Sequence, residues 1–230
     1  MVPCPIADDG DMARVLPEYN ADIVRSINYF VVENLRTGRR FLSRVGMGRP
    51  IDTLQLAELN EHTAPAEVES LIAPILAGEN CAMISEAGCP GVADPGAALA
   101  ALCHRHGVRV VPLVGPSSIL LALMASGMNG QSFAFNGYLP VKTPERQRAL
   151  RTLERRARSE HQSQIFIEAP YRNRQLLEAI VATCAPDTRV TVAVDITAES
   201  ERIVTRSVAE WRRAMPDDLH KRPAIFIIGE

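Results

Sequence analysis

Two carboxylates and a histidine have the chemistry to accept a proton during catalysis. Glu61 and His62 are adjacent, and Glu86 lies in a later segment rich in glycine and proline. Carboxylates and imidazole serve as general bases, and the unperturbed imidazole pKa of about 6.5 suits that work near neutral pH. We take these three residues as catalytic candidates. The alternative is that each only supports the fold or positions a substrate.

Residues 84–96 form the first of three segments that could hold a ligand. The segment follows an apolar run and contains Gly88, Gly91 and Gly96, which allow tight turns and close approach of the backbone to a ligand. Asp94 precedes Pro95, an order typical of an N-cap and a first helical residue. We expect the loop to line a ligand, whereas for Asp94 we favour the capping role over a catalytic one.

The second segment, residues 114–118, leaves an expected strand and enters an expected helix. The hydroxyls of Ser117 and Ser118 and the free N–H groups of a helix start suit an anion or a carboxylate. A capping role for either serine is compatible with this.

The third segment, residues 167–173, is a polar turn after a short apolar run. Tyr171 could pack on a flat ring, and Arg172 could pair with Glu168 or with a substrate. An ordinary turn with an exposed ion pair explains the composition equally well.

Strand-like and helix-like segments alternate along the chain and would position these loops. Such alternation predicts an α/β fold with parallel or mixed sheets, whose ligands bind beyond the carboxyl ends of the strands. A change of pattern places a boundary between domains 1–112 and 113–230. The expected strands are 29–32, 54–59, 81–84, 108–113, 131–139, 165–168, 190–196 and 224–228. The expected helices are 36–45, 63–76 (with Thr63 as a candidate cap), 95–106, 117–126, 144–159, 172–184 and 208–214.

Bulk properties narrow the class of protein. The 230 residues carry a net charge of −2, which argues against a protein that simply coats nucleic acid. No apolar run is long enough to cross a bilayer and no signal-peptide pattern starts the chain, so the cytoplasm is the expected location. The five cysteines and the pair His104 and His106 lack metal-ligand spacing, and we expect neither a disulfide framework nor a metal site.

Charge is nevertheless uneven. Residues 142–158 hold seven basic and two acidic side chains, a local charge of +5, on a chain whose remainder then sums to −7. Such a patch on an acidic body suits a phosphate-bearing partner, because Lys and Arg clusters make phosphate contacts. A solvated surface helix is the alternative.

Several motifs in order resemble the tetrapyrrole-methylase superfamily, and within it the branch of ribosomal RNA small-subunit methyltransferase I. The resemblance runs over nearly the whole chain. The motifs are the S-E-A-G-C-P of residues 85–90, the D-P-G of 94–96, the V-P-L-V-G-P-S-S of 111–118, the A-S-G of 125–127 and the G-Y-L-P of 137–140. Weaker likenesses are the E-N-L-R of 33–36 and the N-E of 60–61.

The resemblance implies two αβα domains, a homodimer, and S-adenosylmethionine held between the domains. It implies methyl transfer to RNA, with ribose 2′-O-methylation of ribosomal RNA as the leading hypothesis. The implied neighbours of the cofactor are Ser85, Ala87, Gly88, Pro90, Val92, Ala93, Asp94, Ser117, Ser118, Ala169 and Thr197. The expected RNA contacts are Lys142, Arg146, Arg148, Arg151 and Arg155.

Some positions depart from the family pattern and keep two alternatives open. Glu86 and Cys89 replace an Asp and a Thr, Leu59 replaces a His, and the first glycine loop is reduced to residues 4–10. One alternative is methylation of a small tetrapyrrole or corrin precursor, whose carboxylates the same arginines could meet. The other is a cofactor-binding protein without catalysis. A G-x-G-x-x-G after a strand, the mark of a Rossmann-type site, is absent from the sequence.

Overall fold

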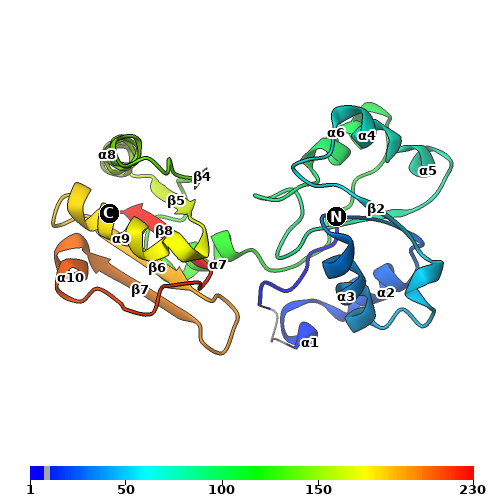
Figure 1. Ribbon diagram of the computed structural model, residues 1–230, viewed down its shortest axis with the longest axis horizontal. Coiled ribbons are helices and arrows are strands. Elements are labelled where there is room, and N and C mark those ends of the chain that lie inside the picture. The colour runs from blue at the N-terminus through cyan, green and yellow to red at the C-terminus, as the bar shows by residue number, and fades with distance from the viewer. Residues whose placement is uncertain (8–10) are drawn as a thin grey trace. The chain divides into compact units, whose positions relative to one another are not determined.

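A three-stranded and a five-stranded sheet form the centres of two units, Met1–Ser117 (unit 1) and Ser118–Glu230 (unit 2). The computed structural model describes residues 1–7 and 11–230, shown in Figure 1. Part of the first loop, residues 8–10, lies outside the described residues. The division between the units falls a few residues beyond the expected boundary at 112/113.

The sheet of unit 1 is parallel, with strand order β2-β1-β3. The strands are β1 (Tyr29–Val32), β2 (Gln55–Glu58) and β3 (Cys81–Ile84). All four residues of β1 are buried, as expected for the central strand of a parallel sheet covered on both faces. Because all three strands run the same way, their carboxyl ends meet at one edge.

Helices cover both faces of this sheet (Figure 1). Phe30 and Val32 pack with α2 (Glu18–Arg25) and α3 (Leu35–Val45), while Tyr29 and Val31 pack toward α6 (Ala97–Arg105) and the 71–72 turn. The remaining short elements are α1 (Met12–Val15), the 3-10 turn η1 (Ile51–Thr53), α4 (Pro65–Ser70) and α5 (Ala73–Leu76).

The sheet of unit 2 is mixed, with strand order β4-β5-β8-β6-β7. The strands are β4 (Phe133–Tyr138), β5 (Ser163–Ile167), β6 (Arg189–Val194), β7 (Arg202–Ser207) and β8 (Ala224–Gly229). β4 runs parallel to β5, and β8 runs antiparallel to β5 and β6. The carboxyl ends of β4, β5 and β6 therefore meet at one edge, together with the beginning of β8.

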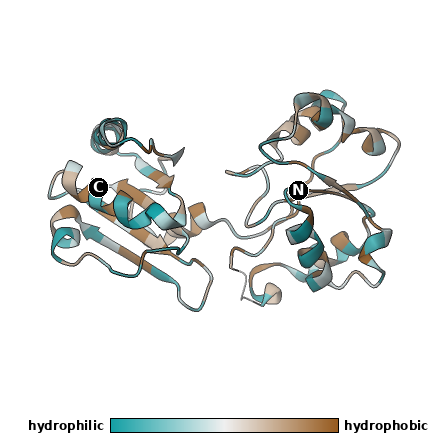
Figure 2. Ribbon diagram, viewed as in Figure 1, coloured by the Kyte–Doolittle hydropathy of each residue, from teal (hydrophilic) through white to brown (hydrophobic). Residues whose placement is uncertain are grey.

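One face of this sheet holds the main core of unit 2. There Phe166 and Phe226 stack with ring centroids 6.0 Å apart, beneath side chains of three helices. Those helices are α8 (Thr143–Glu160), α9 (Asn173–Thr183) and α10 (Val208–Arg213). The helix α7 (Ser118–Ser126) contacts β7 and β8, and Thr205 Oγ1 donates a hydrogen bond to its Ser126 carbonyl at 2.7 Å. In Figure 2, α8 is predominantly hydrophilic while the strands are largely hydrophobic.

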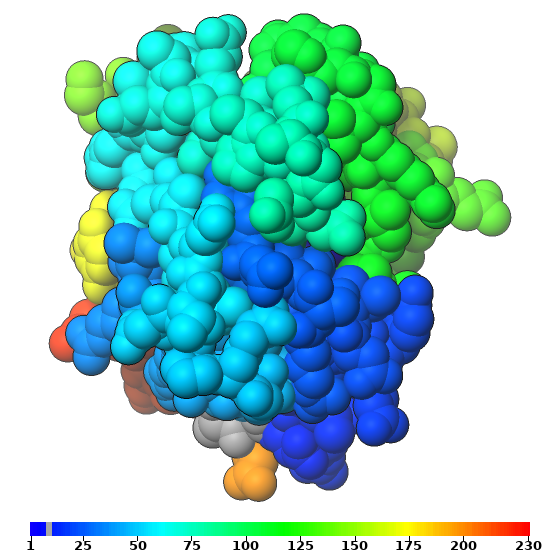
Figure 3. Space-filling model, turned by 90° about the vertical axis from the view of Figure 1, so that its right-hand side faces the viewer, coloured from blue at the N-terminus to red at the C-terminus, as the bar shows by residue number. Residues whose placement is uncertain are grey.

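The structure confirms the α/β class and corrects three expectations. Residues 108–113 form no strand, although Leu113 N–H donates to the Met1 carbonyl at 3.0 Å. In Figure 3 the early part of the chain, in blue, adjoins the green segment that follows α6. The helix expected over 63–76 divides into α4 and α5, since Pro74 lacks the N–H that a continuous helix needs. Ala64, not Thr63, occupies the N-cap of α4. The strand β7 and the helices α1 and α2 were not predicted.

Candidate functional site

The carboxyl edge of the sheet in unit 1 collects the polar residues that could act on a ligand. Glu33 directly follows β1, Glu61 and His62 lie in the turn after β2, and Ser85 and Glu86 directly follow β3. The parallel register brings these strand ends together, which is the usual place for ligands in α/β sheets. The structure thus places all three catalytic candidates at one edge.

Carboxylates at this edge are linked through the backbone and a hydroxyl. Glu33 Oε2 accepts a hydrogen bond from the Glu86 N–H at 3.0 Å, and Glu86 Oε1 accepts one from Thr37 Oγ1 at 3.2 Å. Burial raises the pKa of Glu33 above its usual value. The hydrogen bond from the Glu86 N–H lowers this pKa, whereas the charges of Glu86 and Glu61 raise it further. The edge therefore holds several carboxylates, of which Glu33 is partly buried while Glu61 and Glu86 are exposed.

Asp94 belongs to the same acidic group. Burial, followed by the charge of Glu33, raises the pKa of Asp94 to about 6, whereas a hydrogen bond from Ser85 opposes the rise. Our prediction that Asp94 caps a helix is wrong. The helix α6 begins at Ala97, and its N-cap is Gly96 with φ of +129°, so Asp94 lies two residues before the capping position.

The glycine loop of residues 85–96 is built from turns that favour glycine. Gly88 has φ of +69° and exchanges two backbone hydrogen bonds with Cys4, at 2.8 and 3.2 Å. The Gly91 N–H donates to the Pro95 carbonyl at 3.0 Å, which closes the second half of the loop. Ala93 has φ of +65° without being a glycine, a conformation that functional loops often retain.

Residues 114–117 lie against this loop. The Cys89 thiol contacts the Pro116 carbonyl at 3.3 Å, and Asn20 Nδ2 donates to the Val114 carbonyl at 2.8 Å. Gly115 packs so tightly on Pro3 that it has no room for a Cβ. The structure thus brings Ser117 into the same region as the predicted cofactor neighbours of the loop. Those are Ser85, Ala87, Gly88, Pro90, Val92, Ala93 and Asp94.

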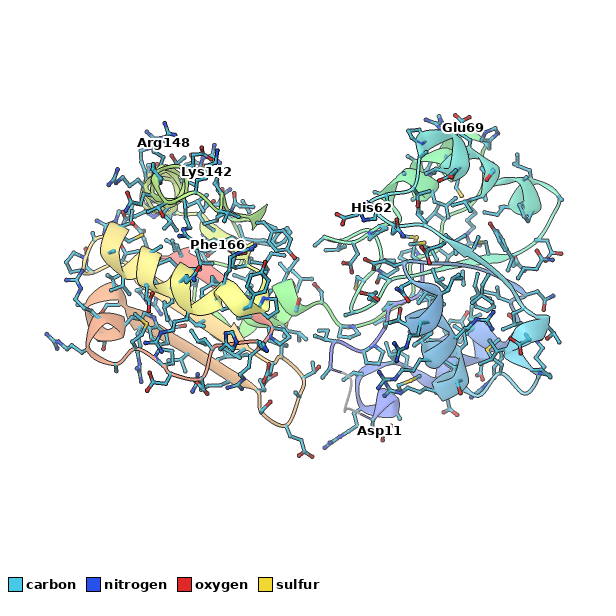
Figure 4. The ribbon with its side chains drawn as sticks, in the orientation of Figure 1. Asp11, His62, Glu69, Lys142, Arg148 and Phe166 are labelled. Carbon is cyan, nitrogen blue, oxygen red and sulfur yellow. The ribbon has the colours of Figure 1, made fainter. Side chains whose placement is uncertain are left out.

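The predicted catalytic residues differ in how they are held. Glu61 and His62 project into solvent, with side chains 85% and 83% exposed and 3.5 Å between Oε1 and Nε2 (Figure 4 labels His62). The turn is fixed by Asn60 Oδ1, which accepts from the His62 N–H at 2.9 Å. Glu86 is the best oriented of the three, because its carboxylate accepts from Thr37 and its backbone N–H donates to Glu33.

Sequence reasoning missed Glu33 as a site residue. Its position could have indicated this role, because Glu33 is the first residue after the fully buried strand β1 and therefore lies at the carboxyl edge of the sheet. Its near neighbours along the chain, Asn34 and Thr37, cap α3 and orient Glu86. Ser85 and Glu86, in contrast, were predicted from the glycine-rich loop and the family motif that contain them.

In unit 2 two of the three remaining cofactor candidates, Ala169 and Thr197, lie just beyond the carboxyl ends of strands. Ala169 follows β5, and its N–H donates to Glu168 Oε1 at 2.7 Å. Thr197 follows β6 with φ of +73°, a strained conformation for a β-branched residue, and its N–H donates to Glu201 Oε2 at 2.7 Å. Ser118 is the first residue of α7.

A buried ion pair anchors the turn that contains Ala169. Arg172 donates to Glu168 Oε1 at 2.7 Å, and the Glu168 side chain is only 1% exposed. Of the two roles that the sequence left open for Arg172, the structure shows the pairing with Glu168. The other carboxylate oxygen, Oε2, is buried without a hydrogen-bond partner among the described residues.

The basic segment forms the long helix α8. Arg148, Arg151 and Arg155 are exposed on the face opposite Leu150 and Leu153, which join the core. Lys142 is exposed at the N-cap (Figure 4 labels Lys142 and Arg148). Arg146 departs from our expectation, because it is 8% exposed on the buried face of the helix. Arg158 is already paired with Asp187 at 2.7 Å.

Within residues 1–7 and 11–230, no group of three or more His, Cys, Asp or Glu side chains is arranged to hold a metal ion. All five cysteines are free thiols. No helix in this part of the chain is long and apolar enough to cross a membrane.

Comparisons with known proteins agree with the geometry. Residues 20–211 match the family of tetrapyrrole (corrin/porphyrin) methylases. Two relatives, each named ribosomal RNA small subunit methyltransferase I, match 99% of the chain at 30% identity and 75% of their own length. They come from Escherichia coli O157:H7 and Vibrio cholerae serotype O1. A third with this name, from Bacillus subtilis, is 29% identical over 91% of the chain and 67% of its own length.

Solved structures of methyltransferases share the fold. The crystal structure of the methyltransferase CobJ covers 94% of this chain and 89% of its own, at a TM-score of 0.63 and 16% identity. The cobalt precorrin-4 methyltransferase CbiF covers 92% of this chain and 87% of its own, at 0.57 and 14%. The ordered loops, the two α/β units and these matches lead to one conclusion: the chain belongs to the tetrapyrrole-methylase family, as a methyltransferase that uses S-adenosylmethionine, and it resembles the branch of ribosomal RNA small-subunit methyltransferase I.

Proposed function

We propose that this methyltransferase acts on ribosomal RNA and methylates a ribose 2′-hydroxyl. The match over 99% of the chain to relatives named ribosomal RNA small subunit methyltransferase I is the observation that carries the proposal. The exposed arginines of α8 support it, because a phosphate-bearing substrate needs such contacts. A small tetrapyrrole or corrin precursor is the second candidate, favoured by the fold shared with CobJ and CbiF.

The residues of unit 1 fit S-adenosylmethionine. This cofactor carries a positive sulfonium and an ammonium group, and the edge of the sheet offers the carboxylates of Glu33, Glu86 and Asp94. The loop of residues 85–96 has three glycines at positive φ, so its backbone can approach a ligand closely. We propose that this loop and Ser117 contact the cofactor, whereas the contacts expected from Ser118, Ala169 and Thr197 of unit 2 stay predictions.

When bound, the cofactor supplies a methyl group already activated by the adjacent positive charge. The chain then has to align the acceptor hydroxyl and accept its proton, and such alignment is worth up to roughly 7–11 kcal/mol. We propose Glu86 as the proton acceptor, because Thr37 and the backbone hold it at the carboxyl edge. Glu61 and His62, which are exposed in the neighbouring turn, are proposed to position the substrate.

Methyl transfer to RNA tests the proposal directly. The purified protein with radiolabelled S-adenosylmethionine is expected to label small-subunit ribosomal RNA from a strain that lacks the corresponding methyltransferase, and not RNA from its parent. Glu86→Gln is expected to lower kcat by roughly 100-fold with little change in KM, as for loss of a general base. Transfer to a tetrapyrrole precursor but not to RNA would favour the second candidate. Binding of S-adenosylhomocysteine without methyl transfer to either substrate would support the third alternative, a cofactor-binding protein without catalysis.

Replacing Arg148, Arg151 and Arg155 together with alanine is expected to weaken RNA binding and flatten its salt dependence. If each arginine meets one phosphate, the slope of log K against log salt falls by about 2 to 3. Arg105→Ala, which removes an exposed arginine of unit 1, serves as the control and should leave the slope unchanged. An unchanged slope in the triple variant would exclude this face of α8 as a phosphate contact.

Asp94 gives cofactor binding a predicted pH dependence. With a pKa of about 6 in the folded protein, Asp94 gains its charge as pH rises through 6, and affinity for the cationic cofactor should rise over the same range. Calorimetry is expected to show at least fivefold tighter binding at pH 7.5 than at pH 5. Asp94→Asn should remove most of that change.

The same residue should lower stability as pH rises. Between pH 4 and 6 the unfolded chain has released the Asp94 proton while the folded chain still holds it, so the free energy of unfolding falls. After a discount for solvent screening, the expected change is about 1 kcal/mol. Asp94→Asn should therefore be more stable than the parent at pH 7.5 while it binds cofactor more weakly. A variant that loses both stability and binding would contradict this assignment.

We further propose that the protein is a cytoplasmic homodimer, as the family resemblance implies. Light scattering of the purified chain at micromolar concentration gives the mass directly, and a value near the 25.2 kDa of one chain would refute the dimer.

A further inference from the structure

Two of the four tyrosines lie exposed at the carboxyl ends of neighbouring strands in unit 2. Tyr138 ends β4 and pairs in register with Ile167, the last residue of β5. Tyr171 lies four residues after Ile167, in the 3-10 turn η2 (Pro170–Arg172). Their exposed fractions are 64% and 57%. Large aromatic side chains this exposed, at the ends of adjacent strands, leave ring faces open to a partner.

A guanidinium group holds Tyr171 in place. Arg172 lies over the Tyr171 ring, with its Cζ 4.7 Å from the centroid, and donates a hydrogen bond to the Tyr171 hydroxyl. Glu168 fixes the other side of the guanidinium at 2.7 Å from a buried position. The hydrogen bond that Arg172 donates to Glu168 raises the pKa of Arg172 most, and the charges of Tyr171 and Tyr138 add to the rise.

The basic helix begins a few residues beyond Tyr138. Residues 139–142 connect β4 to α8, whose exposed face carries Arg148, Arg151 and Arg155. No ion pair to an acidic side chain of the described residues occupies these three guanidinium groups. A polyanion that reaches the tyrosines would therefore meet uncompensated positive charge along the same part of unit 2.

We propose that Tyr138, Tyr171 and Arg172 form a stacking platform for an unstacked base of single-stranded RNA, whose phosphates continue along α8. The proposal rests on RNA as the substrate class. Proteins that recognise RNA loops stack splayed-out bases on aromatic rings and guanidinium planes, whereas duplex RNA offers no free base face. The buried Glu168 keeps the guanidinium plane fixed before RNA arrives, so little ordering is needed on binding.

Fluorescence anisotropy with a labelled single-stranded RNA of about 12 nucleotides tests the platform. Tyr138→Ala and Tyr171→Ala are each expected to weaken binding roughly 5- to 150-fold, the range found when one stacked base is lost. Tyr138→Phe and Tyr171→Phe should keep the parent affinity within about twofold, since stacking needs the ring and not the hydroxyl. The slope of affinity against salt should stay unchanged in the alanine variants, in contrast to the arginine variants of α8.

Tyr19→Ala is the matched control, because Tyr19 is 65% exposed on α2 of unit 1. It should bind RNA as the parent does. Parent-like RNA binding by both platform alanine variants, or an equal loss for a duplex of the same sequence, would overturn the platform and leave the RNA substrate intact. No RNA binding by the parent, with S-adenosylhomocysteine still bound, would overturn both the platform and the RNA substrate.

Discussion

Gly115→Ala is expected to destabilise unit 1 severely and to abolish cofactor binding. A Cβ at position 115 would lie 2.2 Å from Cβ and 2.6 Å from Cγ of Pro3, and 3.3 Å from a methyl carbon of Leu16. Contacts below 3.0 Å force something to move, and a proline ring cannot rotate away as a flexible side chain does. Overpacking costs about 1–3 kcal/mol, and these distances favour the upper end.

The effect on cofactor binding follows from what residues 114–116 support. The Val114 carbonyl accepts from Asn20, and the Pro116 carbonyl contacts the Cys89 thiol. If the backbone at Gly115 shifts to relieve the clash, the loop of residues 85–96 loses its support from this side. Ser117, which belongs to the proposed cofactor site, is displaced with it.

Scanning calorimetry and titration with S-adenosylhomocysteine measure the two effects. The melting temperature should fall by roughly 10 °C, as expected for a loss near 3 kcal/mol in a domain of this size. Gly130→Ala is the control, since nothing lies within 4 Å of its Cβ position and its φ is not positive. A Gly115→Ala protein that melts and binds like the control would show that Pro3 yields easily.

Burial patterns explain why the strands nearest the site could be predicted from the sequence. Tyr29–Val32 and Cys81–Ile84 are short apolar runs followed at once by polar residues, and the structure confirms both ranges. Because a parallel sheet brings carboxyl ends together, their successors share an edge whatever the loops do. Glu61, His62 and Glu86 were chosen by residue type and motif, and the structure shows that they share this edge.

Other features depended on contacts between distant residues. Residues 108–113 are apolar enough for a strand, but their hydrogen bonds go to Met1 rather than to a neighbouring strand. The strand β7 reads as Arg-Ile-Val-Thr-Arg-Ser, and only its pairing with β6 at the edge of the sheet identifies it. The acidic group of Glu33 and Asp94 also escaped notice, since these residues lie 61 positions apart and meet through the fold.

Arg172→Met is expected to cost unit 2 about 3 kcal/mol of unfolding free energy. The substitution leaves Glu168, 1% exposed, with only the Ala169 N–H as a partner for its charge. Removing one member of a buried ion pair typically costs about 3–5 kcal/mol, and the 23% exposure of Arg172 favours the lower end. The single tryptophan, Trp211, is buried in α10 of the same unit, so its fluorescence reports the unfolding of unit 2 in urea.

Arg174→Met in the next helix is the matched control. Arg174 pairs with Glu178 at 3.0 Å and Asp217 at 3.1 Å, but all three side chains are about half exposed or more, so the loss of stability should be much smaller than for Arg172→Met. The double variant Glu168→Leu with Arg172→Met should recover most of the stability, because it removes the unpaired charge together with its partner. Equal losses for Arg172→Met and Arg174→Met, or no recovery in the double variant, would mean that the pair contributes packing rather than charge compensation. In that case the guanidinium plane beside Tyr171 would not be held by Glu168, and it would have to be ordered when RNA binds.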